Sequence, residues 1–464
     1  MIRLAGTLCT LALGLGGDDP PRALLLDTVA TPLGTQLDSA LRSAEQRGFS
    51  GVVRVERDGR LLLRKGYGVA NRSRRIPFSD ATVVQIGSNT KDFTLVALLR
   101  LQQRGELSLR DSLGRFFPDA PADKRGITLQ QLVDHRGGLP IGLGGDFDMV
   151  TRDQLLTRVF AVPLRAQPGT REIYSNTGYA LLAAVIERVT GKSYDAHVRD
   201  DVLVPLGLED TGYLLPRFDP DRVAHGYRRG DDQGNILLKP HAADGPYWNL
   251  RGNGGMVSTV EDMHAFYRAL FDGERVLSRG ARGNRFDPTE PVALAGSDLV
   301  HFFLFERLPA DRLEIIVATN SAEAPAPLIR DAIAPLLGLP RSGRAGGDTP
   351  APPPAGARPP EPAVATLIRD VLAAVNAADS TALTRFVTER FAQDGGPTVE
   401  QRTQRLRQMH DNLGTLTLAS MWVETGNAVH VSATTGKEGP ATLIFDVTAE
   451  PVPKIRTVRV MVGG

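Results

Sequence analysis

The chain has 464 residues, of which 42% are hydrophobic and 23% are charged, and its formal net charge is +1 at pH 7. These values are ordinary for globular protein, and the length allows more than one domain. A nearly neutral charge gives no general reason to bind nucleic acid or an anionic membrane, and no basic run with interleaved aromatic residues is present. We therefore expect a small-molecule or peptide substrate and no nucleic-acid partner.

Cysteine and histidine usage gives no sign of a metal site. The single cysteine, Cys9, excludes an intrachain disulfide, and the eight histidines are scattered singly. No Cys/His ligand spacing and no H-E-x-x-H motif occurs. We interpret the histidines as structural or surface residues and expect no metal and no cofactor.

The N-terminal stretch MIRLAGTLCTLALGLGG places Arg3 before an apolar run that ends in small residues. This order is typical of an export signal, and the run is too short to span a bilayer. Residues 1–17 are therefore predicted to be a signal peptide, cleaved near Gly16, which sends the protein to the periplasm or the extracellular space. Cys9 lacks the small residue that usually precedes a lipidated cysteine, so no lipid anchor is expected. The alternative is a disordered or helical N-terminus on a cytoplasmic protein.

A first domain is predicted over residues 30–338. Its first hairpin spans 51–71 and turns at Asp58-Gly59, and a second hairpin spans 299–320. Strands at both ends of the domain with helices between them suggest a sheet built from the two ends and a helical insertion in the middle. Helices are predicted over 37–48, from Asn89 to Gly105, and over 128–134, 152–160, 177–190 and 326–338.

Residues 341–363, RSGRAGGDTPAPPPAGARPPEPA, contain prolines, glycines and alanines in place of a hydrophobic period. Such a stretch reads as a semi-extended linker. After it, residues 364–464 are predicted to form helices first and an antiparallel sheet afterwards, an α+β domain that resembles the cone-shaped nuclear-transport-factor or cystatin-like folds. The predicted helices are 364–379, 380–392 and 399–414, and the strands are TLTLASMWVE, AVHVSATT, ATLIFDVTAE and KIRTVRVMV.

The stretch QIGSNTKDF places Ser88 three residues before Lys91, which is one of only seven lysines. A serine hydroxyl needs a nearby base to act as a nucleophile, and residues i and i+3 share a helix face. The N-terminal end of a helix also favours negative charge that develops nearby. The pair is therefore a candidate nucleophile and base, although serine is also a favoured helix N-cap and the lysine could be solvated.

The S-x-x-K motif of penicillin-binding proteins is accompanied by two further elements, the last of which is K-T-G. Two tyrosine-containing triplets are candidates for the second element. Tyr174-Ser175-Asn176 directly precedes a predicted helix, which would leave a phenol and an amide exposed at the helix start. Tyr247-Trp248-Asn249 lies in a loop without such a frame, and we interpret it as structural.

Residues 35–338 resemble the serine beta-lactamase-related family, which includes class C beta-lactamases, D-alanyl-D-alanine carboxypeptidases and related esterases. The resemblance rests on IGSNTKDFT and PGTREIYSNTGY, and on three signposts that occur in the expected order: LQQLVDHRGGLP, VLVPLGLEDTGY and GNGGMVSTVEDM. It implies an α/β + α fold of the beta-lactamase/transpeptidase type, with an antiparallel sheet flanked by helices and a helical subdomain.

The resemblance also implies roles for individual residues. Ser88 would be acylated, Lys91 and Tyr174 would share proton transfer, and Asn176 would position the substrate. For Lys91 to accept a proton near pH 7, burial must lower its pKa from the usual 10.4 or so. Backbone N–H groups, one of them from Ser88, would stabilise the oxyanion.

The third element departs from the family pattern. Counting back from the strand IIVATN places it at Leu294-Ala295-Gly296, and Gly296 and Ser297 are the implied substrate-binding residues. Leucine carries neither charge nor a hydrogen-bonding group, so it cannot bind a substrate carboxylate as lysine does. The glycine and phenylalanine that usually follow are also replaced, near Val300 and His301, and the stretch between Met263 and Leu294 is short for the family. Two other triplets are poorer candidates: Lys437-Glu438-Gly439 lies beyond the linker and is interpreted as a turn, and His135-Arg136-Gly137 belongs to the signpost LQQLVDHRGGLP.

These observations predict an exported serine hydrolase that acts through an acyl-enzyme on an ester or amide. The alternative is a catalytically impaired binding module on the same fold, because the third element is altered. A Ser-His-Asp hydrolase is a third possibility, although the chain has no G-x-S-x-G motif to support it.

Overall fold

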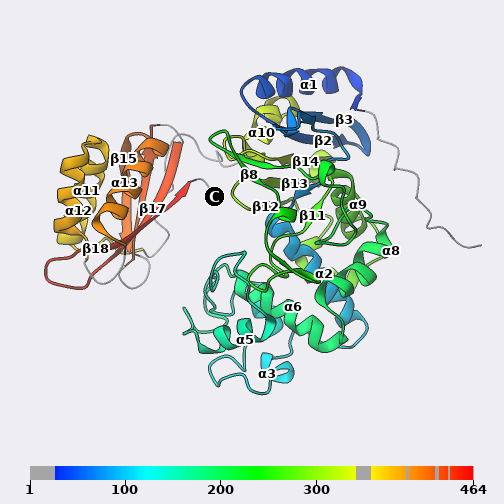
Figure 1. Ribbon diagram of the computed structural model, residues 1–464, viewed down its shortest axis with the longest axis horizontal. Coiled ribbons are helices and arrows are strands. Elements are labelled where there is room, and N and C mark those ends of the chain that lie inside the picture. Colours follow the sequence, from blue (N-terminus) through cyan, green and yellow to red (C-terminus); the bar gives the residue numbers. More distant parts are fainter. Residues whose placement is uncertain (1–26, 341–356, 393–396, 424–427, 437–438, 463–464) are drawn as a thin grey trace, which may run out of the picture. The chain divides into compact units, whose positions relative to one another are not determined.

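The computed structural model describes residues 27–340, 357–392, 397–423, 428–436 and 439–462 (Figure 1). The chain divides into two compact units, residues 1–338 and 339–464. The predicted signal peptide lies outside the described residues, and so does most of the predicted linker. No helix in the described ranges is long and apolar enough to cross a membrane.

The first unit is built on a six-stranded antiparallel sheet with the order β1-β3-β2-β14-β13-β12. The centre of the sheet pairs the two ends of the unit, since Gly51 in β2 lies opposite Thr319 in β14. The predicted sheet from both ends of the domain is therefore confirmed. The strands are β1 (Thr28–Val29), β2 (Gly51–Arg57), β3 (Arg60–Tyr67), β12 (Val292–Ser297), β13 (Phe302–Leu308) and β14 (Leu313–Thr319).

The predicted Asp58-Gly59 hairpin turn is also confirmed. Asp58 and Gly59 have φ angles of 56° and 70°, and two positive φ angles are the signature of the tight turn that suits the twist of a hairpin. This turn sets the register of β2 against β3.

Helices cover both faces of this sheet. Figure 1 shows α1 (Thr31–Gln46) and α10 (Ala326–Ile333) on one side, and α2 (Thr90–Gln103) and α9 (Val260–Phe271) on the other. The helical region between the two halves of the sheet further contains α3 (Leu113–Phe116), α4 (Leu129–Val133), α5 (Arg152–Ala161), α6 (Asn176–Thr190), α7 (Tyr194–Val198) and α8 (Val204–Leu206).

Helix α2 lies at the centre of this unit, and nearly all of its side chains are buried. The ring of Phe93 stacks on that of Phe266 from α9 at 3.9 Å, and α6 packs on the same helix. Because the helix is enclosed, it has apolar residues on several sides and not along a single stripe. It provides a rigid support for the residues at its N-terminal end.

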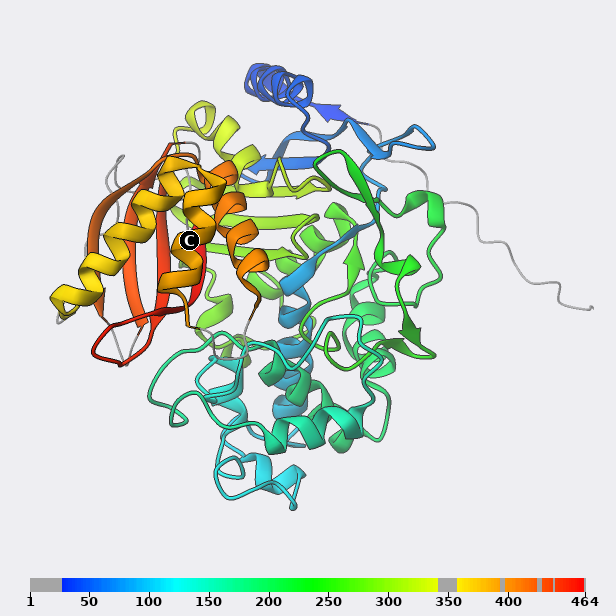
Figure 2. The same cartoon turned by 60° about the vertical axis from the view of Figure 1, so that its left-hand side comes forward.

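The second unit places three helices over one face of a four-stranded antiparallel sheet (Figure 2). This order of helices before strands is confirmed as predicted. The apolar residues of the helices and of the sheet form a core of their own. The elements are α11 (Pro362–Ala377), α12 (Ser380–Arg390), α13 (Val399–Leu413), β15 (Leu416–Val423), β16 (Ala428–Thr435), β17 (Gly439–Val447) and β18 (Ile455–Val462), with the strands in sequence order.

Replacing Phe93 with alanine should destabilise the first unit by about 3–5 kcal/mol, because it leaves a cavity beneath a fully buried aromatic ring. Urea unfolding in a Trp422→Phe background would measure this, since Trp248 is then the sole tryptophan and reports on the first unit. The control is Leu328→Ala, whose side chain is 54% exposed and whose loss should change the free energy of unfolding little. Equal effects of the two substitutions would contradict the central place of α2.

Candidate active site

Ser88 lies in a short 3-10 helix, Gly87–Asn89, that leads directly into α2. The sequence places a small residue before it, and Gly87 adopts a φ of 49°, a left-handed conformation that favours glycine. The preceding strand β6 (Val84–Gln85) pairs with β11 (Val257–Ser258), which fixes the entry to this turn. Ser88 therefore stands at the N-terminal edge of a buried helix, as the sequence predicts.

The hydroxyl of Ser88 contacts two other predicted site residues. The Lys91 Nζ donates a hydrogen bond to the Ser88 Oγ at 3.0 Å, and the Tyr174 hydroxyl lies 2.7 Å from the same oxygen. The Lys91 Nζ also donates to the backbone carbonyl of Asn253 at 2.7 Å. The structure thus brings Ser88, Lys91 and Tyr174 together from positions up to 86 residues apart.

The Lys91 side chain is only 4% exposed, and burial lowers its pKa to about 7. The carboxylate of Asp92 acts in the opposite direction, and the guanidinium of Arg285 lowers the pKa further. Near neutral pH a substantial fraction of this amine is uncharged, so it can accept a proton from Ser88.

Tyr174 is held from behind by His135. The two rings lie 4.4 Å apart, and the His135 Nδ1 accepts a hydrogen bond from the backbone N–H of Ser175. Burial, with the positive charge of Lys91 as a smaller contribution, lowers the pKa of His135 to about 4, so this imidazole is neutral. Burial raises the pKa of Tyr174, so its phenol is protonated at neutral pH and can donate a proton. His135 therefore serves a structural purpose, in line with the interpretation of the histidines.

Asn176 is the first residue of α6, and the Ser175 side chain caps this helix by accepting a hydrogen bond from the N–H of Gly178. Asn176 and Ser88 both line a cavity of about 290 Å³. The Asn176 Oδ1 is buried and has no hydrogen-bond partner among the described residues. A buried polar atom without a partner is uncommon in a folded protein, and this one belongs to a residue that lines the cavity.

Strand β12 runs against the turn that carries Ser88. A Cβ atom at Gly296 would lie 2.7 Å from the Ser88 backbone nitrogen, and one at Gly87 would lie 2.3 Å from the Ser297 nitrogen. The two backbones therefore touch, and glycine is required at both positions. Ser297 lines the cavity, whereas Gly296 forms the contact behind it.

Leu294, the residue at the altered third element, does not line this cavity. Its side chain is 5% exposed and belongs to the main apolar core, while its backbone carbonyl accepts a hydrogen bond from the Asn89 side chain at 3.2 Å. Val300 is a lining residue, and His301 is buried, with its Nδ1 near Gln85 and Asp298 and its Nε2 near the carbonyl of Ala224. The strand is thus in the expected place, and its leucine is a core residue.

The sequence profile named Beta-lactamase matches residues 29–295, which is more than half of the chain. The chain belongs to the beta-lactamase family. Related penicillin-binding proteins and class A beta-lactamases have a nucleophilic serine in an S-x-x-K motif.

Individual relatives agree with this membership. A putative penicillin-binding protein PbpX from Bacillus subtilis is 28% identical over 241 residues, which cover 52% of this chain and 59% of that protein. A putative D-alanyl-D-alanine carboxypeptidase from Escherichia coli O157:H7 is 25% identical over 276 residues, covering 51% and 64%. The chain therefore spans less than two thirds of either relative.

The crystal structure of FmtA from Staphylococcus aureus superposes with a TM-score of 0.58 at 22% identity, covering 69% of this chain and 93% of that one. This likeness confirms the beta-lactamase/transpeptidase-like fold.

Sequence reasoning missed several residues around the site of this beta-lactamase-family domain. Asn253 acts through its backbone carbonyl, which no side-chain pattern can reveal. Asp146 lines the cavity from an irregular loop, and Arg285 reaches the helix of Ser88 from the segment before β12. The sequence pointed to Arg285 only indirectly. The segment between α9 and β12 that carries it is short for the family, and β12 has no cation at Leu294.

The three other triplets named from the sequence have different surroundings. Trp248 and Asn249 are buried, and the Asn249 side chain donates to the carbonyl of Gly145, in keeping with a structural part for this triplet. His135 packs behind Tyr174, as described above. Lys437 and Glu438 lie outside the described residues.

One group of side chains in the described ranges has the spacing of metal ligands. The ligand atoms of Glu56, His264 and Glu314 lie within 4.8 Å of one another, away from the cavity of Ser88. Arginines already pair with both carboxylates, since Arg54 contacts Glu56 at 2.8 Å and Arg307 contacts Glu314 at 2.6 Å. These ion pairs balance the negative charge of the cluster.

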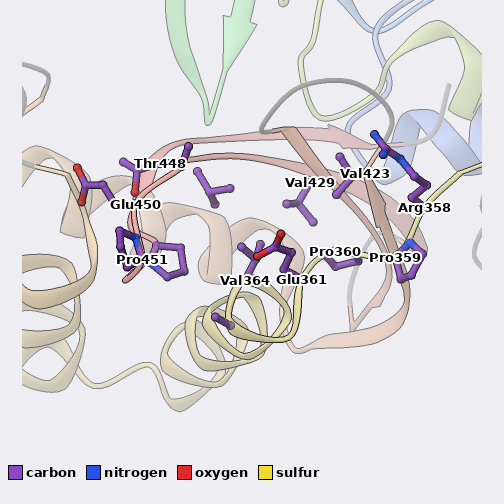
Figure 3. Close-up of a pocket in the computed structure, with 14 residues that line it drawn as sticks. Arg358, Pro359, Pro360, Glu361, Val364, Val423, Val429, Thr448, Glu450 and Pro451 are labelled. Carbon is purple, nitrogen blue, oxygen red and sulfur yellow. The ribbon is translucent and has the colours of Figure 1, made fainter.

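The second unit has a cavity of its own, of about 520 Å³, at one end of its sheet. Figure 3 shows Val364 and Val429 between the helix and the strands, with Arg358 and Glu450 at opposite ends. Its walls are mainly valine and proline, and the described residues that line it include no serine, cysteine, histidine or lysine. They therefore offer no pair of a serine hydroxyl and an amine like that of Ser88 and Lys91.

Replacing Gly87 with alanine should reduce the free energy of unfolding by about 3 kcal/mol or more, because the new Cβ would strike the backbone of Ser297 as well as strain φ. Gly105→Ala is a matched control, since Gly105 also has a positive φ, of 76°, but a Cβ there meets nothing within 4 Å. Its cost should be about 1 kcal/mol. Urea unfolding followed by Trp248 fluorescence measures both, and equal costs would contradict the close backbone contact.

Proposed function

We propose that this chain is a serine hydrolase that acts on an ester or amide through an acyl-enzyme at Ser88. The observation that carries the proposal is the position of the Ser88 Oγ, which lies 3.0 Å from the Lys91 Nζ and 2.7 Å from the Tyr174 hydroxyl, beside a cavity. Membership of the beta-lactamase family supports the same reaction.

In the acylation step, the Ser88 oxygen attacks the substrate carbonyl carbon while the neutral Lys91 amine takes the hydroxyl proton. The negative charge moves to the carbonyl oxygen, for which the backbone N–H groups of Ser88 and Ser297 are the proposed donors, because the two segments are in contact. The bond to the leaving group then breaks. Tyr174 gives its phenolic proton to the leaving alcohol or amine and regains one from the Lys91 ammonium.

Deacylation reverses these roles. A water molecule attacks the ester carbonyl at Ser88 and gives its proton to the same Lys91 and Tyr174 pair. The acid product leaves, and the Ser88 hydroxyl is restored. Asn176 is proposed to orient the substrate, since the residue lines the cavity beside Ser88 and its side-chain oxygen has no hydrogen-bond partner among the described residues.

The absence of a charged side chain at Leu294 bears on which substrates the site can bind. A leucine packed in the core offers no cation to the carboxylate that beta-lactams carry. The proposed substrate is therefore a simple ester or amide in preference to a carboxylate-bearing lactam.

A binding module without turnover is the second candidate, and the altered third element is the observation that favours it. Hydrolysis of a short-chain p-nitrophenyl ester that disappears in Lys91→Ala would exclude this candidate. Binding of the same ester without release of p-nitrophenol would favour it.

Export is also proposed, on the apolar run after Arg3 and on the penicillin-binding and carboxypeptidase relatives. Cell fractionation with an antibody against the second unit would test it. Recovery of the uncleaved chain from the cytoplasm alone would contradict export.

Incubation with a fluorophosphonate should add one covalent group to the protein at Ser88, because the neutral Lys91 and the Tyr174 phenol activate that hydroxyl. Intact-protein and peptide mass spectrometry would locate the adduct. Ser88→Ala should abolish it, and Ser43→Ala, on the exposed face of α1, should leave it unchanged. An adduct of equal yield on Ser88→Ala would refute the assignment of the nucleophile.

Ester hydrolysis should rise with pH through about 7, because the uncharged form of Lys91 is the proton acceptor and its pKa lies there. Below that value kcat/KM should fall about tenfold for each pH unit. A pH profile from about pH 5 to about pH 9 would measure the acid limb. A rate that does not change across this range would argue against Lys91 as the base.

A further inference from the structure

The third element of this chain lacks the cation that its family pattern has, since Leu294 stands in that position and packs into the core. The inference below rests on the proposed function, because it concerns the base of that reaction. Arg285, in the segment just before β12, reaches Asp92 on α2.

Arg285 belongs to a short 3-10 helix, Asn284–Phe286, between α9 and β12. Its guanidinium donates two hydrogen bonds to Asp92 Oδ1, one from Nε at 2.8 Å and one from Nη2 at 2.6 Å. Asp92 directly follows Lys91 on α2, and its side chain is 1% exposed. A buried carboxylate next to the proposed base is thus paired with a cation from a separate segment.

The Asp92 carboxylate is also connected to the strand that faces Ser88. The Tyr267 hydroxyl donates to Asp92 Oδ2 at 2.9 Å, and it accepts a hydrogen bond from the Asn89 side-chain amide at 2.7 Å. That amide also donates to the carbonyl of Leu294. The network therefore joins Arg285 to the residue after Ser88, to the residue after Lys91 and to the altered third element.

We propose that Arg285 is a positioning residue that, through its ion pair with Asp92, keeps the neighbouring Lys91 neutral and able to accept a proton. An unpaired Asp92 carboxylate would favour the charged form of the neighbouring amine. The guanidinium of Arg285 acts in the opposite direction.

The other described groups that face Lys91 do not provide a positive charge that would favour its neutral form. Asp146, from the loop at the cavity, favours the ammonium form, as Asp92 does. His135 is neutral above a pKa of about 4, and burial raises the pKa values of Tyr174 and Tyr179, so neither phenol is charged at neutral pH. Among the groups that act on Lys91 in the described part of the chain, Arg285 is the cation.

The test follows the protonation of Lys91 itself. In protein labelled with 13C at the lysine Cε, the NMR chemical shift of each Cε reports the charge of its amine. The chain has seven lysines, so at most seven signals are expected. The signal that disappears in Lys91→Met is that of Lys91. In Arg285→Gln the titration midpoint of Lys91 should rise by about one pH unit, a modest value because the Arg285 side chain is 44% exposed and partly screened. Arg285→Lys keeps the charge and should leave the midpoint within a few tenths of a unit.

Two further variants separate charge from structure. Arg279→Gln removes an arginine that is 85% exposed and pairs with Glu274, and it should not move the midpoint. The double variant Asp92→Asn/Arg285→Gln lacks both charges, so the titration midpoint of Lys91 should return toward that of the wild type. This double variant also provides a result if Arg285→Gln alone fails to fold. An unchanged midpoint in folded Arg285→Gln, or an equal shift in Arg285→Lys, would overturn the proposal.

The titration of Lys91 can be measured whether or not the protein hydrolyses esters, so failure of the proposed function and failure of the Arg285 proposal give different results. If the protein hydrolyses esters, the acid limb of kcat/KM should shift upward with the titration midpoint in Arg285→Gln. If no ester is hydrolysed and no adduct forms at Ser88, the proposed function fails, while the titration of Lys91 still decides the part of Arg285.

Discussion

The candidate site depends on one close contact between two backbones. Strand β12 lies so near the turn of Ser88 that neither Gly87 nor Gly296 has room for a Cβ atom. This contact places the amide of Ser297 beside that of Ser88, and it closes the cavity on one side. The turn is held by the enclosed helix α2, and β12 is held by the sheet. Two rigid elements from distant parts of the chain therefore meet at the proposed nucleophile.

The buried Lys91 lowers the free energy of unfolding of the first unit. Lys91 has a pKa of about 7 in the folded protein, well below its ordinary value, so the folded state binds fewer protons than the unfolded state between about pH 7 and about pH 10.5. Stability consequently rises with pH across that window, and at neutral pH the buried amine costs a few kcal/mol. Such a cost is expected where a group is kept reactive. The ion pair of Arg285 with Asp92 lies next to this unfavourable group and compensates a buried carboxylate.

The sequence was sufficient for the sheet, for most helices and for the grouping of Ser88, Lys91 and Tyr174, because these rest on hydrophobic period, turn residues and short motifs. It could not reveal contacts made through the backbone, such as that of Asn253 with Lys91, or the burial that sets the pKa of a lysine. Arg285 was missed for a related reason. Its place next to Asp92 depends on how the segment before β12 folds back over α2, and no local pattern encodes that distance.

The pairing of β2 with β14 brings together residues that are separated by more than half of the chain. During synthesis, the turn of Ser88 and all of α2 are complete long before β12, β13 and β14 have been made. Strand pairs between residues so far apart in the chain form slowly, because the long segment between them loses conformational freedom before the pairing contributes stability. A nascent chain that ends before residue 292 therefore has the serine and its lysine but lacks the strand that faces them. Assembly of the cleft is therefore a late event, because it needs the last three strands of the first unit.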